Sequence, residues 1–129
     1  MTDILTPVSP GELLDKLTIL KIKSQNISDA DKLVNVNNER IALQGVADNH
    51  IPETPELQSL TAALFEVNKQ LWVIEDDIRN CERAGDFGDA FIRLARAVYV
   101  TNDKRADLKK RINIAMGSKL VEEKSYADY

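Results

Sequence analysis

Residues 54–85 have the sequence TPELQSLTAALFEVNKQLWVIEDDIRNCERAG and contain the most regular pattern of the chain. Apolar or thiol side chains recur there at alternating spacings of three and four, a pattern typical of a heptad seam along one side of a long helix. The seam consists of Leu57, Leu60, Leu64, Val67, Leu71, Ile74, Ile78 and Cys81. Pro55 suits the first turn of a helix and Gly85 suits its end, so the pattern predicts a helix over about 55–84.

A second long helix is predicted over about 87–116, because the same spacing returns directly after Gly85. Asp86 is expected to cap its start and Gly117 to end it. Two of the seam positions are polar; the seam consists of Phe87, Phe91, Leu94, Val98, Thr101, Arg105, Leu108, Ile112 and Ala115.

A turn at Gly85 would fold the two long helices into an antiparallel hairpin. In that register Glu75 falls near Arg96, and Glu66 falls near Arg105. The charges also complement each other, because residues 51–90 carry 3 basic and 9 acidic side chains, whereas residues 91–129 carry 9 and 5. The basic run at 109–111 is therefore interpreted as a solvated face or an internal partner for acids.

Two shorter helices are expected in the first half of the chain. Residues 9–12 (SPGE) form a capping box, which predicts a helix from Ser9 to near Asn26. A second cap at Ser28–Asp31 predicts a helix that ends at Gly45, followed by a loop over 47–54. The predicted fold is thus all-α, with four helices dominated by the long antiparallel hairpin. Residues 1–129 are expected to form a single domain, and the tail 118–129 either is irregular or docks on the bundle.

The composition excludes several classes of protein. The 129 residues carry a net charge of −4, whereas proteins that coat nucleic acid are usually basic, so a nucleic-acid partner is not expected. One cysteine, Cys81, and one histidine, His50, exclude a disulfide framework, a cysteine-based zinc site and a histidine-rich metal site. No cofactor or metal is expected. No apolar run approaches the roughly 20 residues of a membrane span, and the N-terminus lacks an export pattern, so a cytoplasmic location without a membrane partner is expected.

The polar seam positions Thr101 and Arg105 mark the candidate site. An unpaired buried arginine is costly, so Arg105 needs a partner. Either Glu66 pairs with it and fixes the helix register, or a polar pocket receives an anionic ligand through the planar guanidinium. The residues considered for such a pocket are Lys16, Arg79, Arg96, Tyr99, Thr101, Asn102 and Arg105.

Two further side chains have alternative interpretations. Lys16 borders the apolar stripe of the first helix, where it either snorkels beside Glu12 or binds an anion in the same pocket as Arg105. Trp72 follows Phe65 by seven residues, which indicates a second apolar face on the third helix. That face would contact the first two helices or a second copy of the chain.

Several segments of the chain carry a family resemblance. These segments are 7–23 (PVSPGELLDKLTILKIK), 76–79 (DDIR), 85–87 (GDF), 101–105 (TNDKR) and 122–126 (EEKSY). Together they resemble a family of small bacterial and phage proteins catalogued as a domain of unknown function. The resemblance implies a small complete domain and a link with glycan or lipopolysaccharide biosynthesis. It implies no catalytic residues.

Two functions remain in view from the sequence. One is a non-catalytic interaction or accessory module, which forms a homo-oligomer or binds a protein partner. The alternative is a protein, whether enzyme or not, that binds an anionic small molecule such as a nucleotide or sugar nucleotide. No catalytic constellation identifies a reaction, so the sequence leaves the question of enzymatic activity open.

Overall fold

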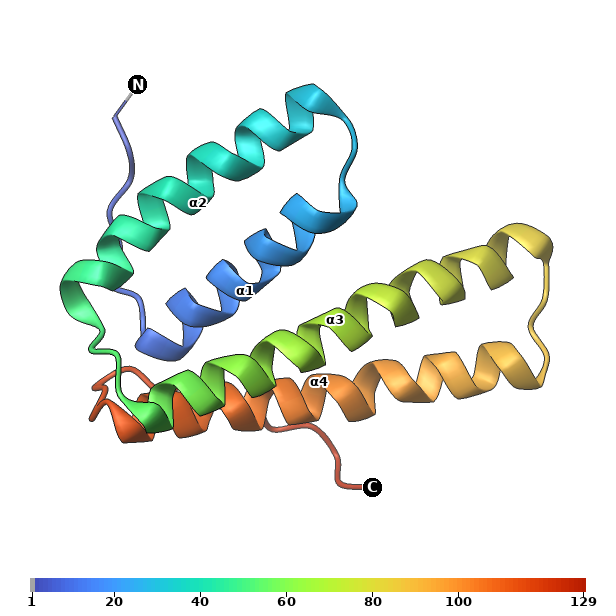
Figure 1. The fold of residues 1–129 in the computed structure, drawn as a ribbon. Coiled ribbons are helices and arrows are strands. Elements are labelled where there is room, and N and C mark those ends of the chain that lie inside the picture. Colours follow the sequence, from blue (N-terminus) through green and yellow to red (C-terminus); the bar gives the residue numbers. More distant parts are fainter. Residues whose placement is uncertain (1) are drawn as a thin grey trace.

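A computed structural model describes residues 2–129 and contains four α-helices within them. They are α1 (Pro10–Asn26), α2 (Ala30–His50), α3 (Pro55–Ala84) and α4 (Asp89–Ala115). Figure 1 shows that α3 and α4 form a long hairpin, with α1 lying between this hairpin and α2. The described residues contain no strand, which confirms the predicted all-α fold dominated by a hairpin.

The turn of the hairpin lies where the sequence predicted it. Gly85 adopts a left-handed conformation with φ 66°, and its backbone N–H donates to the carbonyl of Glu82 at 3.1 Å. The predicted cap of the following helix is wrong, because α4 begins at Asp89 with Gly88 as its N-cap. The Asp86 carboxylate instead accepts a hydrogen bond from the Gly88 N–H at 3.1 Å, which stabilises the turn rather than the helix.

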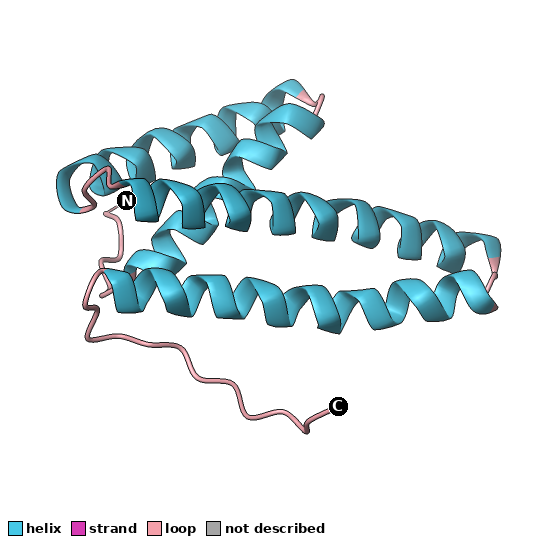
Figure 2. Ribbon diagram, turned by 60° about the horizontal axis from the view of Figure 1, so that its bottom comes forward, coloured by secondary structure: helices cyan, strands magenta, loops and turns pink. Residues whose placement is uncertain are grey.

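α1 packs on the half of the hairpin that is farther from the Gly85 turn, which we call the near half, and contacts both of its helices (Figure 1). Its start follows the prediction, since the Ser9 hydroxyl accepts from the N–H of Glu12 at 3.1 Å. Its end at Asn26 also follows the prediction. α2 contacts only α1 among the other helices, so it forms an outer layer (Figure 2).

α2 departs from the prediction at both ends. Asp29 is its N-cap instead of Ser28, and accepts from the N–H of Lys32 at 3.0 Å. The helix also continues through Gly45 to His50. A glycine inside a helix costs only about 1 kcal/mol, which the surrounding helical hydrogen bonds offset. The predicted loop 47–54 therefore shrinks to residues 51–54.

The core lies where α1 meets the hairpin. Its cluster consists of Leu14, Leu57, Leu60, Leu64, Val67, Leu71, Leu108 and Ile112. All buried residues of α3 lie within 57–71, and all those of α4 lie within 101–113. Residues 72–100 contain no buried side chain. We call these residues the distal arm; the predicted seam is therefore a core only along the near half of the hairpin.

No helix of the described residues combines the length and the apolar character needed to span a bilayer.

Candidate functional site

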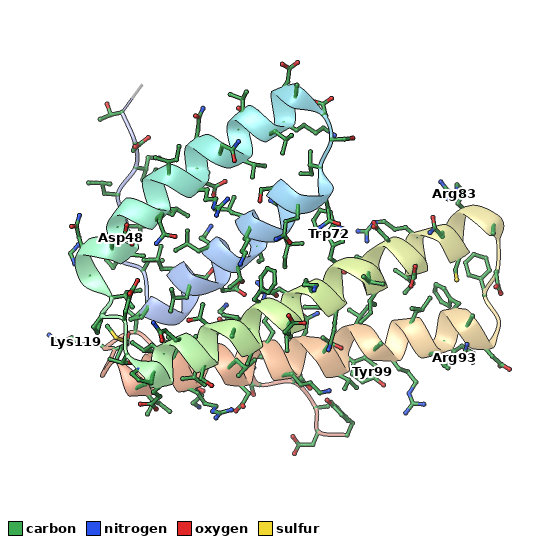
Figure 3. All side chains as sticks on the ribbon, viewed as in Figure 1. Asp48, Trp72, Arg83, Arg93, Tyr99 and Lys119 are labelled. Carbon is green, nitrogen blue, oxygen red and sulfur yellow. The ribbon has the colours of Figure 1, made fainter. Side chains whose placement is uncertain are left out.

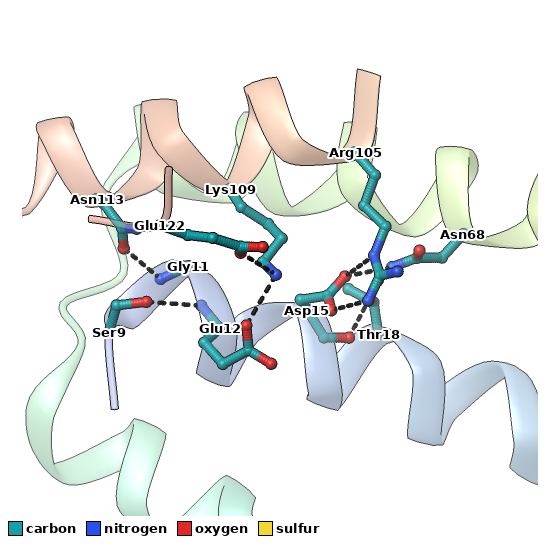
Figure 4. Close-up of polar contacts among 10 residues, drawn as sticks. All are labelled: Ser9, Gly11, Glu12, Asp15, Thr18, Asn68, Arg105, Lys109, Asn113 and Glu122. Atoms are coloured by element: carbon teal, nitrogen blue, oxygen red, sulfur yellow. Dashed lines mark hydrogen bonds and ion pairs between the residues drawn. The ribbon is translucent and has the colours of Figure 1, made fainter. Parts of the chain in front are cut away.

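A buried carboxylate joins three helices at the centre of the molecule. Asp15 of α1 is only 1% exposed, and its Oδ1 accepts from Arg105 Nε of α4 at 2.9 Å (Figure 4). Its Oδ2 accepts from Arg105 Nη2 at 2.5 Å. Asn68 of α3 donates from Nδ2 to Asp15 Oδ1 at 2.9 Å. Because one carboxylate satisfies groups from two other helices, the cluster fixes how α1 sits on the hairpin.

The remaining polar atoms of this cluster are also satisfied. Thr18 donates to the backbone oxygen of Asp15 at 2.7 Å and accepts from Asn68 Nδ2 at 2.8 Å. The hydrogen bond from Arg105 to Asp15 raises the pKa of the guanidinium above its ordinary value. Within the described residues, every fully buried side-chain polar atom has a hydrogen-bond partner.

The predicted partner of Arg105 is therefore wrong. Arg105 binds Asp15, whereas Glu66 lies 4.0 Å from Lys69 on the exposed surface of α3. The prediction considered only the two helices of the hairpin, but Arg105 points towards α1. Glu75 likewise pairs with Arg79 on its own helix rather than with a residue of α4.

Asp15 was missed by the sequence analysis, although a signal was present. It lies on the same face of α1 as three other buried residues, Gly11, Thr18 and Ile22. Their spacings of four, three and four residues mark one side of a helix. An acid within such a stripe needs a buried partner, which Arg105 supplies.

A second set of ion pairs ties the C-terminal tail to the bundle. Lys109 Nζ lies 2.8 Å from Glu12 of α1 and 2.8 Å from Glu122 of the tail. Burial lowers the pKa of Lys109, but the hydrogen bonds to both glutamates outweigh that effect and raise it. The tail 118–129 has no helix or strand and returns along α4, where the Tyr129 hydroxyl donates to Asp103 at 2.6 Å.

This arrangement predicts a pH dependence for the tail. Lys109 lowers the pKa of Glu122 below its ordinary value of 4.5, so the contact is complete above that pH and is lost as the pH falls through the lowered value. We expect Lys109→Met to return the Glu122 pKa towards 4.5, measured by carbon-detected NMR titration. The matched control is Lys110→Met, whose side chain faces Glu123 and should leave the Glu122 pKa unchanged. An equal Glu122 pKa in the wild type and Lys109→Met would contradict this account.

Two open cavities flank Arg105. The fork cavity, of about 450 Å³, is lined by residues of α1, α3 and α4. One of them is Trp72, which Figure 3 shows between α1 and α3. The tail cavity, of about 400 Å³, lies between α4 and the C-terminal tail. Both are large enough to admit a small molecule.

Four of the seven candidate residues line one or both of these cavities. Arg79 lines the fork cavity, Tyr99 lines the tail cavity, and Asn102 and Arg105 line both. The other three line neither cavity: Lys16 and Arg96 are exposed, and Thr101 is buried in the hairpin. The candidate set lacked the other residues of the fork cavity, among them Trp72, which was expected only as an apolar contact.

Comparison with known proteins identifies one family. A family of unknown function (DUF6165) matches residues 5–129, which is nearly the whole chain. No curated protein and no solved structure matches this chain.

Proposed function

The chain belongs to the DUF6165 family of unknown function, and we propose that it is a non-catalytic interaction module that acts as a homodimer. The contact between the two copies is the distal arm. The observation that carries the proposal is the absence of any buried side chain between residues 72 and 100, although the heptad spacing continues there.

The seam of the distal arm is only half covered. Its side chains are all half-buried; they are Ile74, Ile78, Cys81, Phe91, Leu94 and Val98, of which Val98 also lines the tail cavity. Val73, Phe87 and Ile92 are more than half exposed, at 56%, 55% and 52%. The proposal assigns these exposed side chains, together with the half-buried seam, to the contact.

A second distal arm offers this surface a matching half-buried seam and complementary charge. Two antiparallel hairpins that share one seam form a four-helix bundle, in which half-buried positions become core. In the arm of α3, acids outnumber bases four to two, whereas the arm of α4 carries Arg93 and Arg96 against Asp89. Packing α3 of one copy beside α4 of the other places opposite charges next to each other.

The polar cluster supports a structural role for the basic residues at the site. Asp15 occupies one edge of the Arg105 guanidinium, and Lys109 lies between Glu12 and Glu122. These ion pairs hold α1 and the tail on the hairpin and so present the distal arm in a fixed position. A role beside enzymes of glycan biosynthesis stays a prediction from the family resemblance.

Sedimentation equilibrium tests the proposal. We expect the wild type at micromolar concentration to have twice the chain mass of 14.5 kDa. Ile78→Lys places a charge in the half-covered seam and should yield a monomer. The core that α1 forms with the near half of the hairpin should still unfold in one cooperative transition. The matched control is Ile41→Lys, at an apolar residue of α2 that is 73% exposed, which should remain a dimer.

Two results would overturn the proposal. One is a wild-type mass of 14.5 kDa throughout the micromolar range. The other is dissociation by Ile41→Lys but not by Ile78→Lys, which would place the contact on α2.

A further inference from the structure

The fork cavity contains an aromatic wall beside several polar groups. Trp72 is half-buried and lines the cavity together with Ile19 of α1 and Leu71. An indole ring at the side of an open cavity offers a flat apolar face on which a planar ring can stack. Trp72 belongs to the distal arm, but the cavity that it lines with Ile19 of α1 does not include the seam residues Ile74, Ile78 and Cys81.

Arg105 brings oriented donors to the same cavity. Its Nε and one Nη2 hydrogen are held by Asp15, and a guanidinium has five N–H groups in a fixed plane. The remaining three point away from Asp15, and Arg105 lines the cavity. The buried carboxylate therefore fixes these donors in place before any ligand arrives.

Two amide side chains complement these donors. Asn68 is only 4% exposed and uses both amide hydrogens on Asp15 and Thr18, which leaves its Oδ1 as an acceptor at the cavity wall. Asn102 is half-buried and also lines the cavity. Its amide forms no side-chain hydrogen bond with another described residue, so both its donor and its acceptor are available.

We propose that the fork cavity binds a nucleoside through its base. A nucleobase is planar and carries adjacent donors and acceptors on its edge, so its face stacks on Trp72 while its edge meets Asn102, Asn68 and Arg105. An amide side chain pairs with such an edge through two hydrogen bonds. Asp76, on the same wall, is an acceptor for ribose hydroxyls.

The charge of the cavity favours a nucleoside over a nucleoside triphosphate. The carboxylates of Glu75 and Asp76 and the guanidiniums of Arg79 and Arg105 line the cavity, and the buried Asp15 carboxylate, which is not part of the wall, pairs with Arg105. Each guanidinium already has a carboxylate partner, and Asp76 adds negative charge. A triphosphate would meet repulsion that a neutral nucleoside avoids.

Fluorescence titration tests this site directly, because Trp72 is the only tryptophan of the chain. Adenosine, uridine and their mono- and triphosphates are added at fixed protein concentration, with ribose as the base-free arm and calorimetry as a second readout. We expect saturable binding of at least one nucleoside, weaker binding of its triphosphate and no response to ribose. Asn102→Ala should weaken nucleoside binding about fivefold or more, the equivalent of one lost bidentate pair.

The matched control is Asn37→Ala, an exposed asparagine on α2, which should bind as the wild type does. Three results would each overturn the assignment: no saturable binding of a nucleoside at millimolar concentration, tighter binding of the triphosphate, or equal affinity in Asn102→Ala. Chain mass measured on the same samples separates these outcomes from a failure of the homodimer, on which this inference does not depend.

Discussion

Replacement of Asp15 by alanine is expected to lower the free energy of unfolding by about 3 kcal/mol or more. The substitution leaves the Arg105 guanidinium and the Asn68 amide without their shared acceptor, and breaking a buried ion pair on one side typically costs about 3–5 kcal/mol. Urea unfolding followed by circular dichroism measures the loss. Asp77→Ala is the control, because this exposed acid of α3 should change stability by no more than about 0.5 kcal/mol.

A double variant separates the pair from the packing around it. Asp15→Leu combined with Arg105→Met removes both charges, and an apolar replacement of a buried pair is often neutral. We expect this variant to recover the part of the loss that comes from the unpaired Arg105 charge, whereas the buried Asn68 amide still lacks its Asp15 acceptor. A loss below about 1 kcal/mol in Asp15→Ala would show that the cluster does not hold α1 on the hairpin.

Replacement of Gly11 by alanine is the second large expected effect. A Cβ at this position would lie 2.4 Å from the backbone oxygen of Lys109 and 2.9 Å from Asn113 Oδ1. A backbone oxygen cannot rotate aside, so α1 would have to move away from α4. That movement would also stretch the hydrogen bond from the Gly11 N–H to Asn113, now 2.7 Å. We expect a loss of about 2–3 kcal/mol in urea unfolding, the upper part of the range for overpacked sites.

Gly45→Ala is the control, because it is expected to change the free energy of unfolding in the opposite direction. A Cβ there would meet nothing within 4 Å, and the residue lies inside α2. Gly45→Ala should therefore raise the free energy of unfolding by about 1 kcal/mol, the difference in helix propensity. Equal stability of Gly11→Ala and the wild type would contradict the close approach of α1 to α4.

The hairpin could be predicted because the features that specify it involve residues close together in the sequence. The heptad spacing of α3, the left-handed turn at Gly85 and the cap at Ser9 each depend on residues a few positions apart. The path of α2 past Gly45 could not be predicted, because one glycine weakens a helix without ending it.

The candidate site was predictable only in part, because periodicity does not give the rotation of one helix against another. Arg105 was singled out correctly as a polar seam residue that needs a partner. Its partner, Asp15, lies 90 residues away in sequence on a helix whose position the heptad pattern does not specify. The placement of Trp72 beside Asn102 and Arg105 depends on the same unspecified contact between α1 and the hairpin.

The homodimer is tested most directly by the rate at which Cys81 reacts with a thiol reagent at different protein concentrations. Cys81 is the only cysteine and lies half-buried in the seam of the distal arm, so no other residue contributes to the signal. The four-helix bundle predicts slower labelling as the concentration rises through the dimerisation range, and rapid labelling of Ile78→Lys at every concentration. A wild-type rate that is the same at all concentrations would contradict packing through the distal arm.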